Sequence, residues 1–258
     1  MANTVFVPEL LEAGITAKLG AAIKLYNIVD VQPLGAEQAG DTVTFLSTEY
    51  IGDAEEVAAG EAIPNGDFTD GNKKVPVKKY AKGLIFTDED FKAGVNLQDR
   101  AETQITKSVA SGVEKALYTA LGTVKPAMTH TEVKTALDVD VISDALVKFG
   151  EDLDGEKYLL INPASLAALR KDKNFVVVTS EKVESPGQIF GCTVVVSSRV
   201  GAKEAFIIKP SALAVRLREA VKIKVQEEAA DDTVLINGRT HAAVALADET
   251  GAIKITLA

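Results

Sequence analysis

One unbroken apolar stripe, running from residue 97 to residue 121, constrains the fold of this chain more than any other feature. Apolar residues recur there at every fourth position, namely Leu97, Ala101, Ile105, Val109, Val113, Leu117 and Leu121. This spacing places them on one face of a single helix, which Asn96 can cap at its start and Gly122 at its end. At 1.5 Å per residue, the twenty-six residues from Asn96 to Leu121 make the helix about 39 Å long, more than twice the globular average. We expect it to be the backbone of the molecule, with solvent on its other face, which carries Glu102, Gln104, Lys107, Ser111 and Lys115.

A long hairpin is predicted before this helix. Residues 42–51 and 75–86 are rich in β-branched and aromatic types, as strands are. Pro76 cannot donate to a sheet, so the second arm should lie at an edge. Loops as long as the one between the arms are uncommon in a compact domain unless they are functional or disordered. Twenty extended residues reach about 65 Å, whereas a compact chain of this length has a radius of gyration of roughly 18 Å, so the hairpin can extend beyond its own domain.

Charge is segregated along this hairpin. Acidic residues come first, at Asp53, Glu55, Glu56, Glu61, Asp67 and Asp70, and basic residues follow at Lys73, Lys74, Lys78, Lys79 and Lys82. A solvated charged loop is one interpretation. The other is attachment to an equivalent molecule, because complementary potentials set the register of a contact and suppress wrong pairings. On that interpretation the loop residues expected at a subunit contact are Asp53, Glu55, Glu56, Glu61, Lys73, Lys74, Lys78 and Lys79.

The N-terminal region predicts another helix, over residues 8–26. Leu11, Ile15, Leu19 and Ile23 recur every four positions, and Pro8 suits the first helical turn. Two interpretations fit this stripe equally. Either the helix packs on the core of its own subunit, or it is an arm that packs on a neighbouring subunit through Leu11, Ile15 and Leu19.

After Gly122 the pattern alternates between helices and strands, which indicates a compact α/β or α+β region. A helix is expected after Asp140, a buried strand at 158–161, a helix capped by Asn162 and Pro163, and strands at 188–197 and 205–209 with a turn or bulge at Gly191. The last residues read as strands at 221–225, 233–236, 242–246 and 252–257, with Asn237-Gly238 as a turn.

Composition excludes several classes of function. A net charge of −9 and a pI near 4.9 argue against a nucleic-acid reader. One cysteine, Cys192, excludes a multi-thiolate site, and His130 and His241 match no zinc spacing. No serine elbow or phosphate-binding loop occurs. The apolar runs are too short to span a membrane, and the N-terminus has no secretory signal, so synthesis in the cytoplasm is expected.

The order of elements resembles the major capsid proteins of tailed bacteriophages. The hairpin closes with Gly83-Leu-Ile-Phe-Thr-Asp-Glu-Asp and is followed by a helix that begins Asn96-Leu-Gln-Asp-Arg-Ala-Glu-Thr-Gln-Ile. Leu160-Ile-Asn-Pro-Ala-Ser-Leu-Ala-Ala-Leu and Gly187-Gln-Ile-Phe-Gly-Cys-Thr-Val-Val-Val-Ser resemble the axial domain of that family, and the closing strands resemble its peripheral domain. The resemblance covers nearly the whole chain.

What the resemblance implies is an α+β, Hong Kong-type capsid fold. It divides the chain into an N-terminal arm (1–39), an extended loop (40–88), the peripheral-domain spine helix (89–123), an axial domain (124–220) and C-terminal strands returning to the peripheral domain (221–258). The implied function is assembly as pentamers and hexamers into an icosahedral head around double-stranded DNA, without catalysis, cofactor or metal. Implied partners are further copies of the chain, a separate scaffolding protein, a portal, a decoration protein and DNA through non-specific proximity only, with assembly in the host cytoplasm.

Two other classes of function stay open. The first is an encapsulin-like nanocompartment of the same fold, whose interior binds a cargo peptide. The second is an enzyme or binding module with an acidic metal site, for which the candidate residues are Asp138, Asp140 and Asp144, or Glu151, Asp152 and Asp154. Neither acidic cluster has the spacing of a calcium loop.

Overall fold

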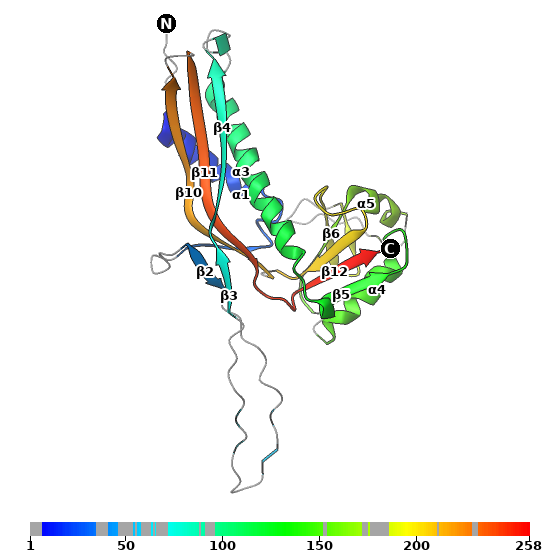
Figure 1. The fold of residues 1–258 in the computed structure, drawn as a ribbon. Coiled ribbons are helices and arrows are strands. Elements are labelled where there is room, and N and C mark those ends of the chain that lie inside the picture. Colours follow the sequence, from blue (N-terminus) through cyan, green and yellow to red (C-terminus); the bar gives the residue numbers. More distant parts are fainter. Residues whose placement is uncertain are drawn as a thin grey trace.

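Two sheets are joined by one long helix (Figure 1). The computed structural model describes residues 7–34, 41–45, 54, 56–57, 63, 65, 72–87, 89–90, 96–151, 154–171, 175, 186–210, 212–228 and 232–258. The first sheet has the strand order β1-β10-β11-β4, with β1 at Asp30–Pro33, β10 at Leu213–Glu228, β11 at Thr233–Leu246 and β4 at Lys78–Thr87. Helices α1 (Pro8–Ala22) and α3 (Leu97–Leu121) pack on it.

The second sheet has the strand order β5-β12-β9-β6-β8-β7. Its strands are β5 (Thr129–Glu132), β6 (Lys157–Ile161), β7 (Gln188–Ile189), β8 (Cys192–Val196), β9 (Glu204–Ile208) and β12 (Ala252–Leu257). Helices α4 (Val139–Leu146) and α5 (Pro163–Leu169) and the short turns η1 (Pro126–Met128) and η2 (Val147–Phe149) complete this compact part, which lies beside the C-terminal end of α3 (Figure 1). A third, two-stranded sheet pairs β2 (Thr42–Phe45) with β3 (Lys73–Pro76).

The predicted long helix is confirmed as α3. All seven residues of the apolar stripe are at most 2% exposed. The Asn96 side chain accepts a hydrogen bond from the Asp99 amide and so caps the helix as expected. Because α3 contacts α1, β4 and β11, it forms the centre of the larger hydrophobic core.

The prediction that the opposite face of α3 lies in solvent was wrong for Glu102. This residue is only 8% exposed, because α1 crosses the helix at this point and covers the carboxylate. Lys18 of α1 pairs with it at 2.7 Å. A Cβ at Gly14 would overlap the same carboxylate, so a glycine allows this close approach of the two helices.

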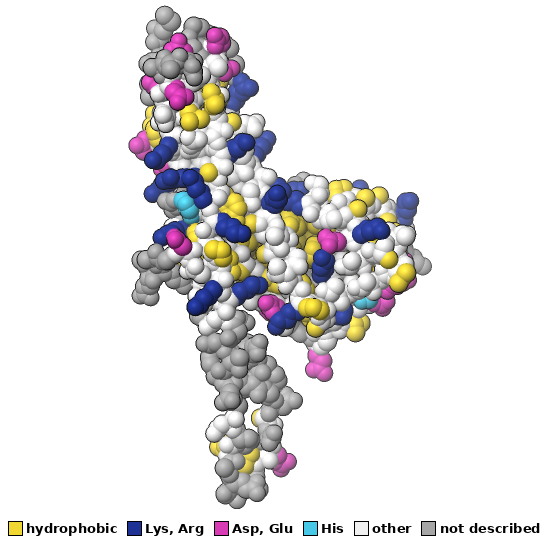
Figure 2. Space-filling view, in the orientation of Figure 1, with side chains coloured by type: hydrophobic (Ala, Val, Ile, Leu, Met, Phe, Trp, Pro, Cys, Tyr) yellow, Lys and Arg dark blue, Asp and Glu magenta, His cyan; other side chains and the backbone are white. Residues whose placement is uncertain are grey.

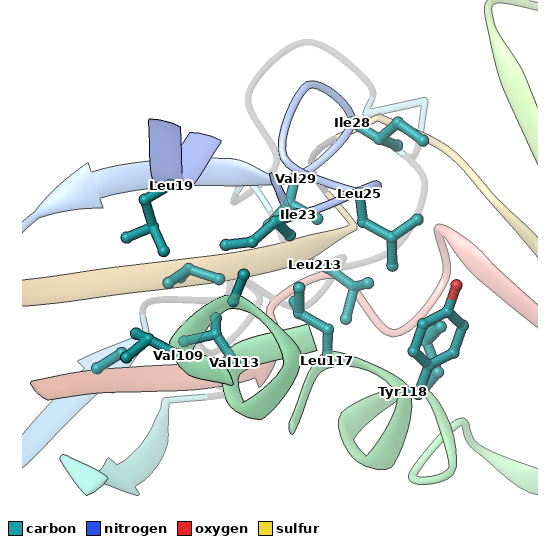
Figure 3. Packing of buried hydrophobic residues seen from close by; sticks show 14 of the residues in the cluster. Leu19, Ile23, Leu25, Ile28, Val29, Val109, Val113, Leu117, Tyr118 and Leu213 are labelled. Carbon is teal, nitrogen blue, oxygen red and sulfur yellow. The ribbon is translucent and has the colours of Figure 1, made fainter. Parts of the chain in front are cut away.

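Helix α1 packs on its own subunit. Leu11 and Ile15 are fully buried and Leu19 is 7% exposed, all within the larger core. Figure 3 shows Leu19 and Ile23 in one cluster with residues of α3 such as Val113. The Ile223 amide of β10 also donates to Glu12 at 2.7 Å. The stripe therefore packs within the subunit, and burial there leaves Leu11, Ile15 and Leu19 little surface for the contact with a neighbour that was the other interpretation.

Strand β11 differs from the prediction of a turn at Asn237-Gly238. Both residues lie inside the strand, with Asn237 opposite Gly83 and Gly238 opposite Lys82 of β4. A Cβ at Gly238 would overlap Cγ2 of Ile105, so glycine is needed here because α3 lies directly against the strand.

The compact part confirms the buried strand at 158–161 and the cap at Asn162, which accepts from the Ala164 amide at 3.0 Å. Gly191 has φ +72°, as a turn glycine can. His130 lies on β5.

The predicted segment of C-terminal strands, residues 221–258, differs from the structure at both of its ends. Strand β10 begins earlier, at Leu213. Strand β12 does not return to the first sheet, because it pairs with β5 and β9 in the second.

Candidate subunit contact site

The root of the predicted hairpin is held by its own subunit. Val43 lies opposite Val75 in the β2–β3 ladder. Val43 and Phe45 are nearly fully buried against a patch of small residues on the first sheet, formed by Ala214, Ala243 and Ala245. The Arg216 guanidinium lies over the Phe45 ring, 5.5 Å from its centroid. The hairpin therefore leaves the subunit from a fixed base.

The structure describes only part of the predicted loop contact. Asp53, Glu55 and Glu61 lie outside the described residues, whereas Glu56 is described and exposed. Ile63 is 75% exposed, which is unusual for a large apolar side chain in an acidic segment. Lys74, Lys78 and Lys79 are exposed on β3 and β4.

Lys73 has a partner within the subunit. Glu249, in the turn between β11 and β12, lies 2.9 Å from Lys125 and 3.7 Å from Lys73. The hydrogen bond from Lys125, with the charges of both lysines, lowers the pKa of Glu249 below its ordinary value. This cluster ties the base of the hairpin to the end of α3.

The fold brings together a basic face that sequence reasoning missed. Because Gly238 faces α3, its neighbour Arg239 points to the other side of the sheet. Lys222 lies directly opposite Arg239, and Lys79 lies two residues before Ala81, the partner of Arg239 on β4. Figure 2 shows Lys and Arg side chains gathered over this sheet. These residues lie side by side only because of the register between the three strands. The sequence pattern of one segment does not contain that information.

A groove of about 330 Å³ runs along the other side of β4. Its lining from α3 includes small residues at one-turn spacing, Gly112, Ala116 and Ala120, together with Lys115 and Thr119. Tyr80 of β4 forms part of the wall, and burial raises the pKa of its hydroxyl. Two lysines, Lys78 and Lys115, stand on the rim. The groove is thus apolar inside and cationic at its border.

The cysteine and the acidic residues considered as catalytic or metal-binding candidates are placed as follows. Cys192 is fully buried, and burial raises the pKa of its thiol to about 11. Asp138 caps α4 by accepting from the Val139 amide at 2.7 Å. Within the described part of the chain, no three His, Cys, Asp or Glu side chains converge as a metal-binding group. None of the helices described there has the length and apolarity needed to span a bilayer.

Comparison with known proteins agrees with this geometry. The major capsid protein of Staphylococcus phage phiMR11 is 27% identical over 258 residues, covering 97% of this chain and 93% of that protein. The capsid structure of cyanophage P-SCSP1u has a TM-score of 0.69 at 11% identity, covering 90% of this chain and 86% of that one. An encapsulin complex from Synechococcus elongatus PCC 7942 has a TM-score of 0.68 at 11% identity, with the same coverage.

These two structural likenesses confirm the Hong Kong-type capsid fold. The family itself is given by the sequence, since the family model described as phage capsid protein matches residues 69–255. That range includes β3, the whole of α3 and both large sheets apart from β1 and the last two residues of β12. The chain therefore belongs to the phage capsid protein family.

Proposed function

We propose that this chain is the major capsid protein of a tailed phage and assembles as pentamers and hexamers into the icosahedral head that encloses double-stranded DNA. The family match over residues 69–255 is the observation that carries the proposal. The likeness to the phiMR11 major capsid protein along 97% of the chain supports it. The role is structural, and the location is the capsid of the virion.

Attachment of one subunit to the next is supported by charge and exposure. A shell needs heterologous contacts that repeat and close by symmetry. The acidic segment that includes Asp53, Glu55, Glu56 and Glu61 complements the basic residues Lys74, Lys78 and Lys79. Lys73 contributes at the base, where it already pairs with Glu249. Each copy thus carries both halves of the proposed contact.

The remaining partners follow from the same role. A scaffolding protein guides assembly in the host cytoplasm, a portal occupies one vertex, and a decoration protein binds the finished shell. DNA is held by proximity only, because a chain with net charge −9 offers little affinity for phosphates. Weak attraction suits a container that must be filled and emptied.

Electron microscopy of the expressed protein, with and without a scaffolding protein, tests the proposal. We expect closed shells from the intact chain. Deletion of residues 52–72 should leave a folded, soluble protein, as judged by circular dichroism and thermal melting, that forms no shells. Normal particles from the deletion variant would refute the proposed role of the loop, and failure of the intact chain to form shells under either condition would refute the function.

An encapsulin-like nanocompartment is the second candidate, favoured by the likeness to the Synechococcus complex. At 11% identity that likeness concerns the fold alone, whereas the phage relative is similar in sequence. Shells purified from the native host separate the two functions. A co-purifying cargo enzyme indicates the nanocompartment, and packaged phage DNA indicates the head.

A further inference from the structure

Arg199, in the turn between β8 and β9, divides the hydrogen bonds of its guanidinium between two residues of α3. Nε donates to Oε2 of Glu114 at 3.0 Å, and Nη2 donates to the hydroxyl of Ser111 at 2.7 Å. We infer that this arginine is a two-position switch, which sets the angle between the compact part and α3 by moving Nη2 between Ser111 and the second oxygen of Glu114. The inference rests on the proposed assembly of one chain into both pentamers and hexamers, and it adds the residue that adapts the subunit to the two positions.

A second position for Nη2 exists because Glu114 has an unused oxygen. Glu114 is 8% exposed, and its Oε1 is buried without a hydrogen-bond partner in the described part of the chain. A buried polar atom that lacks a partner destabilises the fold. Nε and Nη2 of one arginine can bind both oxygens of one carboxylate side by side. Moving Nη2 to Oε1 therefore supplies the missing bond, while the contact between Nε and Oε2 stays in place as a pivot.

The first position is held by a bond that is easily released. Ser111 is exposed on α3, so water replaces the arginine at its hydroxyl when Nη2 leaves. A charge-assisted bond to the buried oxygen of Glu114 is the stronger of the two. Because the structure nevertheless adopts the first position, packing between the compact part and α3 opposes the second, and the two effects offset each other in part.

The apolar contact between the compact part and α3 permits a change of angle. Leu160 of β6 and Val200 of the β8–β9 turn are buried in the same core as Leu117 of α3. Apolar burial is non-directional, so this core holds the two parts together at more than one angle, whereas hydrogen bonds have preferred directions. Packed elements also shift between discrete arrangements, typically by about 1–2 Å. The arginine therefore decides between arrangements that the core allows.

The turn that carries Arg199 is tied to the second sheet. The Asn162 side chain, which follows β6, donates to the Val200 carbonyl at 2.8 Å. The Arg199 amide donates to the Ser197 hydroxyl at 3.3 Å. Because these bonds hold the backbone of the turn, a movement of the guanidinium along α3 is passed to the whole compact part.

Two substitutions bias the switch in opposite directions. Ser111→Ala removes the first position of Nη2. Glu114→Gln weakens the second, because an amide nitrogen donates hydrogen bonds and cannot accept one from the arginine. Thr119→Ala is the matched control, since it also removes a hydroxyl from α3, at a residue that donates to the Lys115 carbonyl of its own helix at 2.9 Å.

Pulsed electron paramagnetic resonance on the unassembled protein measures the angle. Spin labels at Gln104→Cys on α3 and Val133→Cys on the compact part report one distance between two exposed positions. The single native cysteine, Cys192, is fully buried and stays unlabelled. We expect two distances in the labelled parent protein. Ser111→Ala and Glu114→Gln should change the ratio of the two populations about tenfold in opposite directions, and Thr119→Ala should leave it unchanged.

One common distance in all four proteins, or the same displacement from both substitutions, overturns the switch. Circular dichroism shows whether each variant is folded. Should Glu114→Gln fail to fold, Ser111→Ala decides alone, because Ser111 is exposed and its loss leaves the core intact. An unchanged ratio in Ser111→Ala then overturns the inference.

Electron cryo-microscopy of assembled shells tests the link to assembly. We expect Nη2 to lie on Ser111 in the subunits of one type of ring, pentamer or hexamer, and on Oε1 of Glu114 in those of the other. One arrangement in every subunit, or a water molecule on Oε1 throughout, overturns the inference and leaves the proposed function standing. Failure to form shells contradicts the proposed function, whereas the distances in the unassembled protein still decide whether the switch exists.

Discussion

Arg199 donates from Nε to Oε2 of Glu114 across 3.0 Å, and this ion pair joins the compact part to the long helix. The same guanidinium donates to Ser111 at 2.7 Å. Arg199 belongs to the turn between β8 and β9, which Asn162 holds from the other side by donating to the Val200 carbonyl at 2.8 Å. The pair therefore fixes one point at which the two parts meet.

Replacement of Arg199 by alanine should lower the free energy of unfolding by about 2–4 kcal/mol, because it leaves the carboxylate of Glu114 buried without a cation. Glu114 is only 8% exposed. The double variant with Glu114→Gln should recover part of the loss, since no buried charge then remains. Urea unfolding measures both. Lys134→Ala, which breaks an exposed pair with Asp138, is the control and should cost less than about 1 kcal/mol.

Gly238→Ala should destabilise the protein by about 1–3 kcal/mol, because the added methyl group overlaps Cγ2 of Ile105 and the core must shift. Asn237→Ala, at the exposed neighbouring position of β11, is the control and should cost less. In a double-mutant cycle with Ile105→Ala the two losses should fall short of their sum, since the second change removes the overlapping atom. Additive losses would contradict the close packing of α3 on β11.

The Glu249 cluster should make stability depend on pH in the acid range. The pKa of this carboxyl is lowered in the folded state, so its contribution is fully present above the ordinary value of 4.5 and is lost as the pH falls through the folded pKa. Glu249→Gln should therefore reduce the unfolding free energy at pH 7 by up to about 1 kcal/mol and match the native protein once both are measured at a pH below the folded pKa. A difference independent of pH would assign the effect to packing.

Cys192 should be unreactive toward a thiol reagent in the folded protein. The side chain is fully buried and its pKa is raised to about 11, so little thiolate is present or accessible at pH 8. In denaturant the pKa returns to about 8.5 and labelling becomes fast. The Ile63→Cys variant provides the control, because its exposed thiol should react at once in the folded state. Equal labelling rates at the two positions would show that the compact part opens readily.

The elements predicted best from sequence are those whose secondary structure is determined by residues within the element itself. The stripe of α3 needs only its spacing, and the Asn162 cap needs only Asn162 and Pro163. The spacing of the α1 stripe predicts a helix but not what the helix packs against, because Leu11, Ile15 and Leu19 have the same spacing whether they face their own core or a neighbour. Only the tertiary structure shows that they are buried in their own subunit.

The features that could not be predicted from sequence depend on tertiary contacts with residues distant in the chain. Glu102 resembles a solvent residue until α1 covers it with Lys18. Asn237-Gly238 has the chemistry of a turn, and it becomes part of a strand because Ile105 takes the space that a side chain would need. The groove and the basic face each combine residues from distant segments, so no local pattern contains them.

The position of β12 has a consequence for how the subunit is made. This last strand lies inside the second sheet, between β5 and β9, although more than a hundred residues separate it from β5. The compact part cannot close until residues 252–257 have been synthesised, however early the rest of it leaves the ribosome. Chains truncated before residue 252 therefore lack the strand that joins β5 to β9 in the second sheet.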